Sequence, residues 1–247
     1  MKLEGTVALV TGASSGIGEA TARALAAEGA QVALAARRKD RLDALAGELN
    51  GLAIESDITD RDQAINAVET TARELGRLDI VVNNAGVMLL GPIVDAPVEE
   101  WDRMIELNLQ GLLYIAHAAL PHLLRAAERE PRRVADLVNV SSVAGRVPRL
   151  GSGVYNMTKH GVGAFSESLR QEVTKQHVRV SLVEPGAVAT ELTTHLREEI
   201  REASRDRFKD IERMESEDIA DAIRYIVTRR WNVAINEILI RPTQQEG

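Results

Sequence analysis

The stretch Thr6–Gly18, which reads TVALVTGASSGIG, decides the fold. Its first residues, Thr6–Val10, form a short apolar run rich in β-branched side chains, which predicts a fully buried strand. A glycine-rich turn follows and opens an amphipathic helix over Glu19–Glu28, which Gly29 closes as a C-terminal cap. Strand, turn and helix together bring backbone N–H groups and the positive end of a helix dipole to one point. The stretch therefore predicts a pyrophosphate-binding site.

The glycine spacing of the turn is G-x-x-x-G-x-G, not the G-x-G-x-x-G of the commonest dinucleotide fingerprint. Glycine is needed where the backbone must touch a ligand or adopt a positive φ. The alternative is an ordinary glycine-containing turn between a strand and a helix. On the binding interpretation, the turn supplies these cofactor contacts: Gly12, Ser14, Ser15, Gly16, Ile17 and Gly18.

Strands and helices alternate along the rest of the chain. Further strands are predicted at 31–36, 52–55, 78–82, 134–140, 178–183 and 237–240, and helices at 40–49, 59–75, 99–127, 153–176 and 218–229. This alternation predicts one α/β domain over residues 1–247, a doubly wound Rossmann-type parallel sheet of about seven strands with helices on both faces. The charged segment at about 187–215 is poor in strand formers, and we expect it to form a lid over the site.

Composition excludes several classes of function. The 247 residues carry a formal net charge of −7, which disfavours nucleic acid as a partner. The chain has no cysteine, and its five histidines are scattered without metal-binding spacing, so we expect no metal. No apolar run approaches the length of a membrane span, and the first ten residues lack a signal-peptide pattern. We therefore expect a cytoplasmic protein without a membrane partner.

The end of the second predicted strand indicates which nicotinamide cofactor binds. Enzymes that select NAD carry an acid there for the ribose 2′-hydroxyl. Here the strand ends at Ala36, and Arg37 and Arg38 follow. Guanidinium groups in place of the acid suit a 2′-phosphate, so we expect NADP(H). The alternative is that the two arginines merely start the next helix on a wet surface.

Polar residues also follow the third and fourth predicted strands. Asp57, with Ile58 beside it, is either part of the cap of the next helix or an acceptor for the adenine amino group. The sequence Asn83-Asn84-Ala85-Gly86 lies at the carboxyl end of a parallel strand, where such sheets bind ligands. Asn84, Ala85 and Gly86 are therefore candidate cofactor contacts, although asparagines that only tie neighbouring strands together are an equal alternative.

Tyr155 and Lys159 are four residues apart in a predicted helix, so their side chains share one face. A phenol titrates near pH ~10, and a fixed ammonium beside it is expected to lower that pKa. The pair is a candidate proton donor and acceptor. The alternative is a half-buried tyrosine beside a solvated lysine. Asn108 stands among apolar positions of the predicted helix 99–127, where asparagine is mildly unfavourable, which indicates a structural or functional reason for it.

Together these motifs resemble the classical short-chain dehydrogenase/reductase family over essentially the whole chain. They are Thr11–Gly18, Asn83–Gly86, Asn108, Ser142, Tyr155, Lys159 and Pro185-Gly186. The resemblance implies that Tyr155 is the acid/base and that Lys159 binds the nicotinamide ribose and tunes the tyrosine. It implies that Ser142 holds the substrate oxygen and that Asn108 supports a proton-relay water. The cofactor contacts that it implies are Asp57, Asn84, Tyr155, Lys159, Pro185, Gly186, Val188 and, at the carboxamide, Thr190.

The activity that this resemblance implies is reversible hydride transfer between NADP(H) and a small carbonyl or alcohol substrate. It also implies a homotetramer assembled through the helices at about 99–127 and 153–176. Within the family, stretches such as 11–30, 33–38, 83–92 and 238–243 are similar to clavulanic acid dehydrogenase-like NADPH-dependent reductases. A shared scaffold does not carry a shared substrate. Two rivals stay open: a catalytically silent NADP-binding sensor or scaffold, and an epimerase or dehydratase that retains its cofactor.

Overall fold

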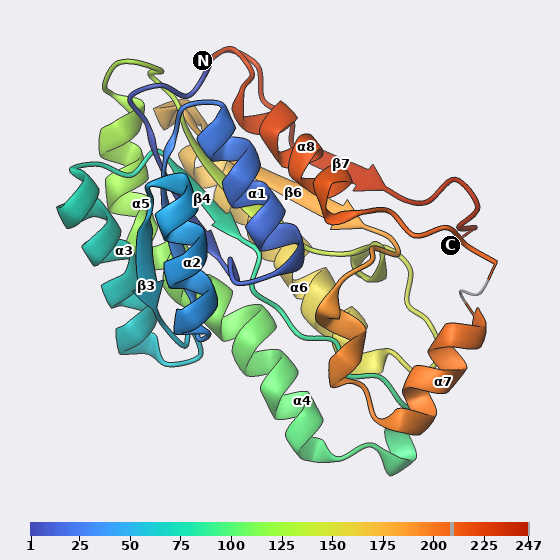
Figure 1. Ribbon diagram of the computed structural model, residues 1–247. Helices are drawn as coiled ribbons and strands as arrows, with labels where there is room; N and C mark the ends of the chain where they lie inside the picture. Colours follow the sequence, from blue (N-terminus) through green and yellow to red (C-terminus); the bar gives the residue numbers. More distant parts are fainter. Residues whose placement is uncertain (208–209, 247) are drawn as a thin grey trace.

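The computed structural model describes residues 1–207 and 210–246. A seven-stranded sheet, parallel throughout, forms its centre in the order β3-β2-β1-β4-β5-β6-β7 (Figure 1). The strands are β1 (Val7–Thr11), β2 (Gln31–Ala36), β3 (Leu52–Glu55), β4 (Ile80–Asn83), β5 (Ala135–Val140), β6 (Val178–Pro185) and β7 (Glu237–Ile240). The predicted doubly wound sheet of about seven strands is confirmed.

Helices cover both faces of the sheet. They are α1 (Gly16–Ala27), α2 (Lys39–Leu49), α3 (Arg61–Leu75), α4 (Val98–Ile105), α5 (Leu112–Ala127), α6 (Gly153–Val173), α7 (Glu198–Arg207) and α8 (Ser216–Val227). Helices α1, α2 and α8 pack on one face, and α3, α5 and α6 pack on the other. Within the described residues, no helix is both long and apolar enough to cross a membrane.

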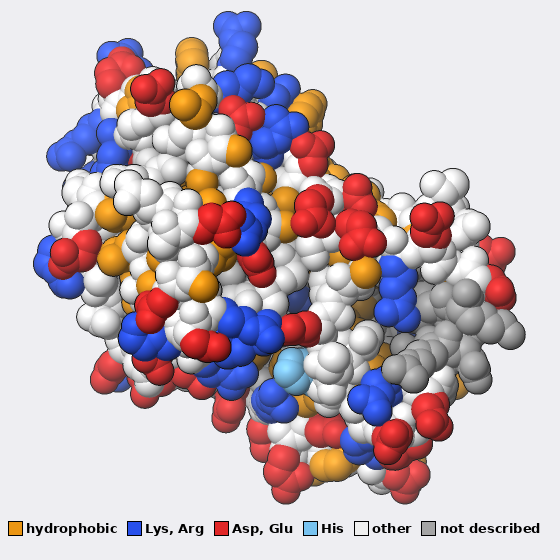
Figure 2. All heavy atoms as spheres, viewed as in Figure 1, with side chains coloured by type: hydrophobic (Ala, Val, Ile, Leu, Met, Phe, Trp, Pro, Cys, Tyr) orange, Lys and Arg blue, Asp and Glu red, His pale blue; other side chains and the backbone are white. Residues whose placement is uncertain are grey.

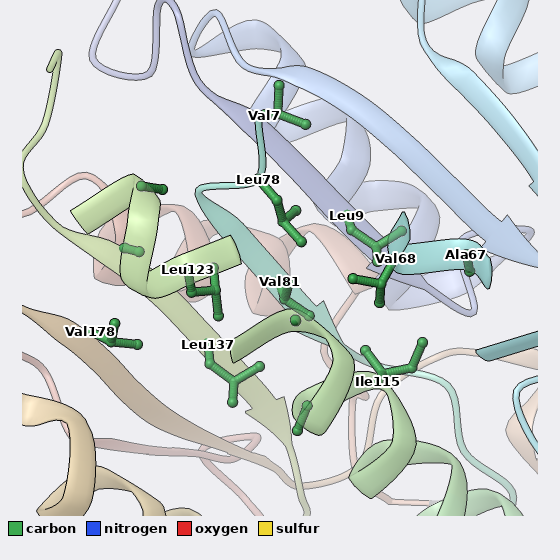
Figure 3. Packing of buried hydrophobic residues seen from close by; sticks show 14 of the residues in the cluster. Val7, Leu9, Ala67, Val68, Leu78, Val81, Ile115, Leu123, Leu137 and Val178 are labelled. Carbon is green, nitrogen blue, oxygen red and sulfur yellow. The ribbon is translucent and has the colours of Figure 1, made fainter. Parts of the chain in front are cut away.

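Strand β1 explains why both faces need a cover. Successive strand side chains point to opposite faces. Val7 and Leu9 therefore join the core under α3 and α5, while Ala8 and Val10 join the core under α1 and α8 (Figure 3). Each fully buried Val or Leu side chain stabilises the fold by roughly 1.5–3 kcal/mol relative to exposure. An apolar run without alternation thus specifies a central strand with helices on both sides.

The strand order reverses beside β1, which has β2 on one side and β4 on the other. In open α/β sheets, ligands bind in the crevice outside the carboxyl ends of the strands at such a switch point. The glycine-rich turn after β1 and the 84–86 segment after β4 both leave the sheet at this edge. The topology therefore brings these two motifs together.

The predicted single helix 99–127 is wrong in one respect. Helices α4 and α5 are separated by a π-helical segment, η2 (Glu106–Gly111), and Asn108 lies inside it. Such wide turns are rare and occur frequently at functional sites. Asn108 exchanges hydrogen bonds with the backbone of Val87, so the asparagine that looked unfavourable in a helix has a tertiary partner.

The segment predicted as a lid leaves the sheet and returns to its own starting point. It holds a 3₁₀ turn, η5 (Glu191–His195), and α7, while residues 208 and 209 lie outside the described residues. Its ends meet, because Ala189 N–H donates to Met214 O at 2.8 Å and Met214 N–H donates to Ala187 O at 3.1 Å. Helix α7 lies at the same end of the molecule as α4, and Arg197 forms an ion pair with Glu100 at 3.2 Å (Figure 1).

Candidate active site

A cavity of about 650 Å³ lies at the carboxyl ends of β1, β2, β4, β5 and β6. Pockets for small molecules have volumes of roughly 300–1,000 Å³. The surface is hollowed between the main body and the part around α7, and acidic and basic side chains are interspersed around it (Figure 2). Every predicted site residue lines this cavity except Gly18 and Asn108.

The glycine-rich turn is shaped by backbone geometry. Gly12 and Gly16 have φ of 65° and 56°, a region that disfavours other residues. Gly18 has a different role, because a Cβ there would lie 2.4 Å from the Gly12 carbonyl oxygen. Gly18, predicted as a cofactor contact, instead lets α1 pack against the turn. The physical reason is that only the first part of the turn faces the cavity.

The N-terminus of α1 has backbone donors that fit a pyrophosphate. Ser15 is the N-cap residue, but its side chain makes no cap hydrogen bond. Its hydroxyl accepts from Arg38 Nη2 at 2.6 Å instead. The first-turn amides of the helix therefore lack a side-chain partner, and they carry the positive end of the helix dipole. The residues present fit a dinucleotide at this point.

The sequence left open whether the asparagines after β4 tie strands together or contact a cofactor, and the structure places the two residues differently. Asn83 Nδ2 donates to Asn139 Oδ1 at 3.0 Å and ties β4 to β5. Asn84 Nδ2 donates to Thr11 O at 3.0 Å, which ties β4 to the turn after β1. Asn84 also lines the cavity, as do Ala85 and Gly86, whereas Asn83 does not. The structural alternative thus holds for Asn83, whereas Asn84 both ties β4 to the turn after β1 and lines the cavity.

Asp57 and Asp60 are also distinct. Asp60 caps α3, because its side chain accepts from the N–H groups of Asp62 and Gln63. Asp57 Oδ1 accepts from the N–H and hydroxyl of Thr59 at 3.1 and 2.8 Å, and the residue lines the cavity with Ile58. The helix cap is therefore Asp60, and Asp57 stays available as a ligand contact.

Arg37 and Arg38 both lie at the end of the cavity beside the glycine-rich turn, but they differ in exposure and in hydrogen bonding. Arg37 is exposed over 61% of its side chain, and its Nη1 lies 3.9 Å from Asp57 Oδ2. Arg38 is anchored, because Nε donates to Ser14 Oγ at 3.0 Å and Nη2 donates to Ser15 Oγ. Both side chains line the cavity beside the glycine-rich turn. Their charge and fork geometry fit a phosphate group.

At the other end of the cavity, Ser142, Tyr155 and Lys159 converge. Tyr155 and Lys159 are each only 6% exposed, and the ammonium lies 5.9 Å from the centre of the tyrosine ring. Lys159 Nζ donates to Val140 O at 3.0 Å, which fixes it against the end of β5. Ser142 Oγ accepts from Ala144 N–H at 3.1 Å, and the serine hydroxyl interacts with the phenol of Tyr155. All three side chains thus line one cavity, and Lys159 is held in place at the end of β5.

The ionisation of this pair differs from what the sequence predicts. Burial raises the pKa of Tyr155 to about 12, although the hydrogen bond with Ser142 acts in the opposite direction. Burial also lowers the pKa of Lys159 to about 8. The expected net lowering of the phenol pKa is wrong here, because the cost of desolvating the phenolate outweighs the interactions that favour it. Tyr155 is therefore protonated at neutral pH.

Asn108 lies behind the cavity, with 1% of its surface exposed. Its Oδ1 accepts from Val87 N–H at 2.8 Å, and its Nδ2 donates to Val87 O at 2.9 Å and to Thr158 Oγ1 at 3.2 Å. A Cβ on Gly86 would lie 3.2 Å from this Oδ1 and 3.7 Å from Lys159 Nζ. Asn108 therefore holds the 86–88 segment against α6, next to the lysine.

Sequence reasoning missed Gln245. Its Oε1 accepts from Ala187 N–H at 2.8 Å, and the buried side chain lines the cavity beside Gly186. Gly186 N–H in turn donates to Ile240 O at 2.7 Å. A glutamine 58 positions from its partner gives no local signal. Among the described residues, no group of acidic or histidine side chains could hold a metal ion.

The fold and the cavity define a Rossmann-type α/β protein in which Ser142, Tyr155 and Lys159 share one cavity with the glycine-rich turn. The model of the short chain dehydrogenase family matches residues 6–201. The chain therefore belongs to the short-chain dehydrogenase/reductase family and is an oxidoreductase.

Individual relatives and solved structures are similar to this chain over nearly its whole length. An uncharacterised oxidoreductase of Staphylococcus aureus is 37% identical over 239 residues, which cover 96% of each chain. The closed form of serine dehydrogenase complexed with NADP⁺ has a TM-score of 0.90 at 31% identity, covering 98% of this chain and 97% of that one. The 3-ketoacyl-(acyl-carrier-protein) reductase from Brucella melitensis, complexed with NADH, has a TM-score of 0.87 at 28% identity, covering 98% and 99%.

Proposed function

We propose that this oxidoreductase transfers a hydride between NADP(H) and a carbonyl or alcohol carbon, and acts as an aldehyde or ketone reductase. The observation that carries the proposal is that Ser142 and the buried side chains of Tyr155 and Lys159 line the same cavity as the glycine-rich turn, with the Lys159 ammonium 5.9 Å from the Tyr155 ring centre. A silent sensor would not need a buried proton donor at that point. The presence of this buried set of side chains favours the proposal over simple cofactor binding.

The cavity residues would hold a nicotinamide cofactor, which would supply or accept the hydride. Ser142 orients the carbonyl oxygen by donating a hydrogen bond. Tyr155, protonated because burial raises its pKa to about 12, gives its hydroxyl proton to that oxygen as the carbon accepts the hydride. The Lys159 ammonium stabilises the phenolate that is left. In the oxidation direction, the phenolate takes the alcohol proton and the carbon gives up the hydride.

The same cavity supports NADP(H) as the cofactor. The amides at the start of α1 would hold the pyrophosphate, and Lys159 would hold the nicotinamide ribose. Arg37 and Arg38 would hold the 2′-phosphate, and no acid stands at Ala36 to favour a free 2′-hydroxyl. The solved serine dehydrogenase carries NADP⁺, while the acyl-carrier-protein reductase carries NADH, so the arginines carry this part of the proposal.

The segment 187–215 is proposed as the substrate lid. Support comes from its described residues, which leave and rejoin the cavity edge at Val188 and Met214 and include the cavity residues Thr190 and His195. The homotetramer, the cytoplasmic location and the likeness to clavulanic acid dehydrogenase-like reductases stay predictions from the sequence.

The test is a panel of aldehydes, ketones and hydroxy acids assayed with NADPH and NADP⁺ at several pH values. We expect cofactor oxidation with at least one carbonyl class and its loss in Tyr155→Phe. Tight cofactor binding without turnover on any substrate would favour the sensor. A cofactor that co-purifies and returns unchanged after each cycle would favour the epimerase or dehydratase.

A further inference from the structure

Glu191 is the first residue of η5. It lies between two arginines at the end of the cavity beside the glycine-rich turn. Its Oε2 lies 2.7 Å from Arg38 Nη1, and its Oε1 lies 2.8 Å from Arg41 Nη1. Arg38 and Arg41 are 153 and 150 positions away in sequence, so these contacts join the segment that follows β6 to the start of α2. Glu191 also lines the cavity, directly after Thr190.

The contact uses hydrogen-bonding capacity that a phosphate would need. Arg38 donates through Nε to Ser14 and through Nη2 to Ser15, and Glu191 accepts from Nη1, so three of its five N–H groups already have a partner. Hydrogen bonds from Arg41 and Arg38 lower the pKa of Glu191 to about 2, so the carboxylate is ionised at every pH at which the enzyme would work. The arginine that fits a 2′-phosphate therefore carries a permanent negative partner.

Arg37 offers the contrast. Its nearest carboxylate oxygen, on Asp57, lies 3.9 Å away, beyond hydrogen-bond distance. A 2′-phosphate could join Arg37 without displacing a hydrogen-bonded acid. The same phosphate at Arg38 would either displace the Glu191 carboxylate or stand close to it, and two like charges at such a separation repel.

We propose that Glu191 is a cofactor-selectivity residue, which competes with the 2′-phosphate for Arg38 and Arg41 and so narrows the preference for NADP(H) over NAD(H). The inference rests on the proposed use of NADP(H). A nucleotide without the 2′-phosphate leaves the two ion pairs intact. A nucleotide that carries the 2′-phosphate must break or share the ion pairs of Glu191 with Arg38 and Arg41. Because Glu191 is the first residue of η5, displacement of its carboxylate shifts the start of the lid.

The expected effect is moderate. The side chains of Glu191, Arg38 and Arg41 are 45%, 40% and 46% exposed, so solvent screens the two ion pairs. Exposed ion pairs contribute little individually, and we expect their removal to change affinity by about three- to tenfold. The change should shrink as salt rises, since exposed charges are screened over a Debye length of about 8 Å near physiological ionic strength.

The experiment is calorimetric titration of the whole protein with adenosine 2′,5′-bisphosphate and with 5′-AMP. The variants are Glu191→Gln, which removes the charge and keeps the shape, and Glu198→Gln as a matched control. Glu198 is an exposed lid acid paired with Arg201 at 3.4 Å, so its variant makes the same change in net charge away from the cavity. Thermal unfolding of each variant verifies that it is folded.

We expect Glu191→Gln to bind the bisphosphate about three- to tenfold more tightly, to bind 5′-AMP as the parent does, and to lose this gain at high salt. Glu198→Gln should match the parent with both ligands. Weaker or unchanged bisphosphate binding in Glu191→Gln, or an equal change with both ligands, overturns the inference while leaving the NADP(H) proposal in place. A parent protein that binds both ligands equally well overturns the NADP(H) proposal, and the inference falls with it.

Discussion

The two ends of the cavity are built in opposite ways. At the catalytic end, Tyr155 and Lys159 are buried, and Lys159 is fixed by a backbone carbonyl of β5. At the end beside the glycine-rich turn, Arg37, Arg38 and Glu191 are partly exposed; Arg38 pairs with Glu191, while Arg37 lies 3.9 Å from a carboxylate oxygen of Asp57. The difference teaches that ionisation at the first end is set by desolvation, whereas the ion pairs at the second end are open to screening by salt; on the proposed function, the first governs proton transfer and the second governs cofactor choice.

The largest expected effect is at Tyr155, in the buried end of the cavity. Replacing Tyr155 with Phe removes the only proton donor that the proposal places on the substrate oxygen, so turnover should fall by roughly 10²–10⁴-fold. NADPH affinity should be largely unchanged, because the ring and its packing remain. Steady-state kinetics together with a binding titration measure both. Turnover close to that of the parent would remove Tyr155 from the mechanism.

The pH dependence tests the buried end without mutation. Because burial raises the pKa of Tyr155 to about 12, its phenolate fraction grows about tenfold per pH unit below that value. Alcohol oxidation should therefore rise from pH 6 to pH ~8 and rise less steeply beyond, where Lys159, with a pKa of about 8, loses its charge. Carbonyl reduction uses the protonated form and should stay flat from pH 6 to pH ~8.

The measurement is kcat in both directions at saturating substrate. A reduction rate that falls with pH through the neutral range would indicate a lowered phenol pKa, which is what the sequence alone suggests. It would mean that the ammonium, rather than desolvation, dominates at the catalytic end.

The exposed end is tested by Arg37→Ala. A charged hydrogen bond to phosphate contributes roughly 1.5–3 kcal/mol, so KM for NADPH should rise about ten- to a hundredfold. KM for NADH should barely change, and the NADPH effect should shrink at high salt. Equal effects on both cofactors would assign Arg37 a structural role.

The smallest expected effect is at Gln245. Gln245→Ala removes the acceptor for Ala187 N–H, a hydrogen bond that contributes about 0.5–1.5 kcal/mol. KM should therefore rise about two- to tenfold, and equally for both cofactors, because this contact lies at the Gly186 loop and away from Arg37 and Arg38. The matched control is Gln244→Ala, which removes an acceptor for the distant Glu212 N–H at 3.1 Å. A rise in KM confined to NADPH would contradict this separation of the two ends of the cavity.

The sequence by itself determined the elements that depend on short-range pattern. The run Thr6–Val10 and its glycine-rich turn specified strand, turn and α1, because apolar run length, glycine geometry and helix caps act within a few residues. The alternation of strands and helices gave the doubly wound sheet, whose strand ends then had to meet. The spacing of Tyr155 and Lys159 placed them on one face of a helix, and the whole set of motifs, rather than this spacing alone, indicated their role.

The tertiary structure alone decided what depends on burial and on distant partners. It placed Asn108 in a π-helical turn against Val87 and brought Glu191 to Arg38 and Gln245 to Ala187. It also reversed the expected pKa shift of Tyr155, because the cost of desolvating a charge depends on everything packed around it. Sequence spacing carries local geometry, whereas desolvation and long-range contacts exist only once the chain has packed.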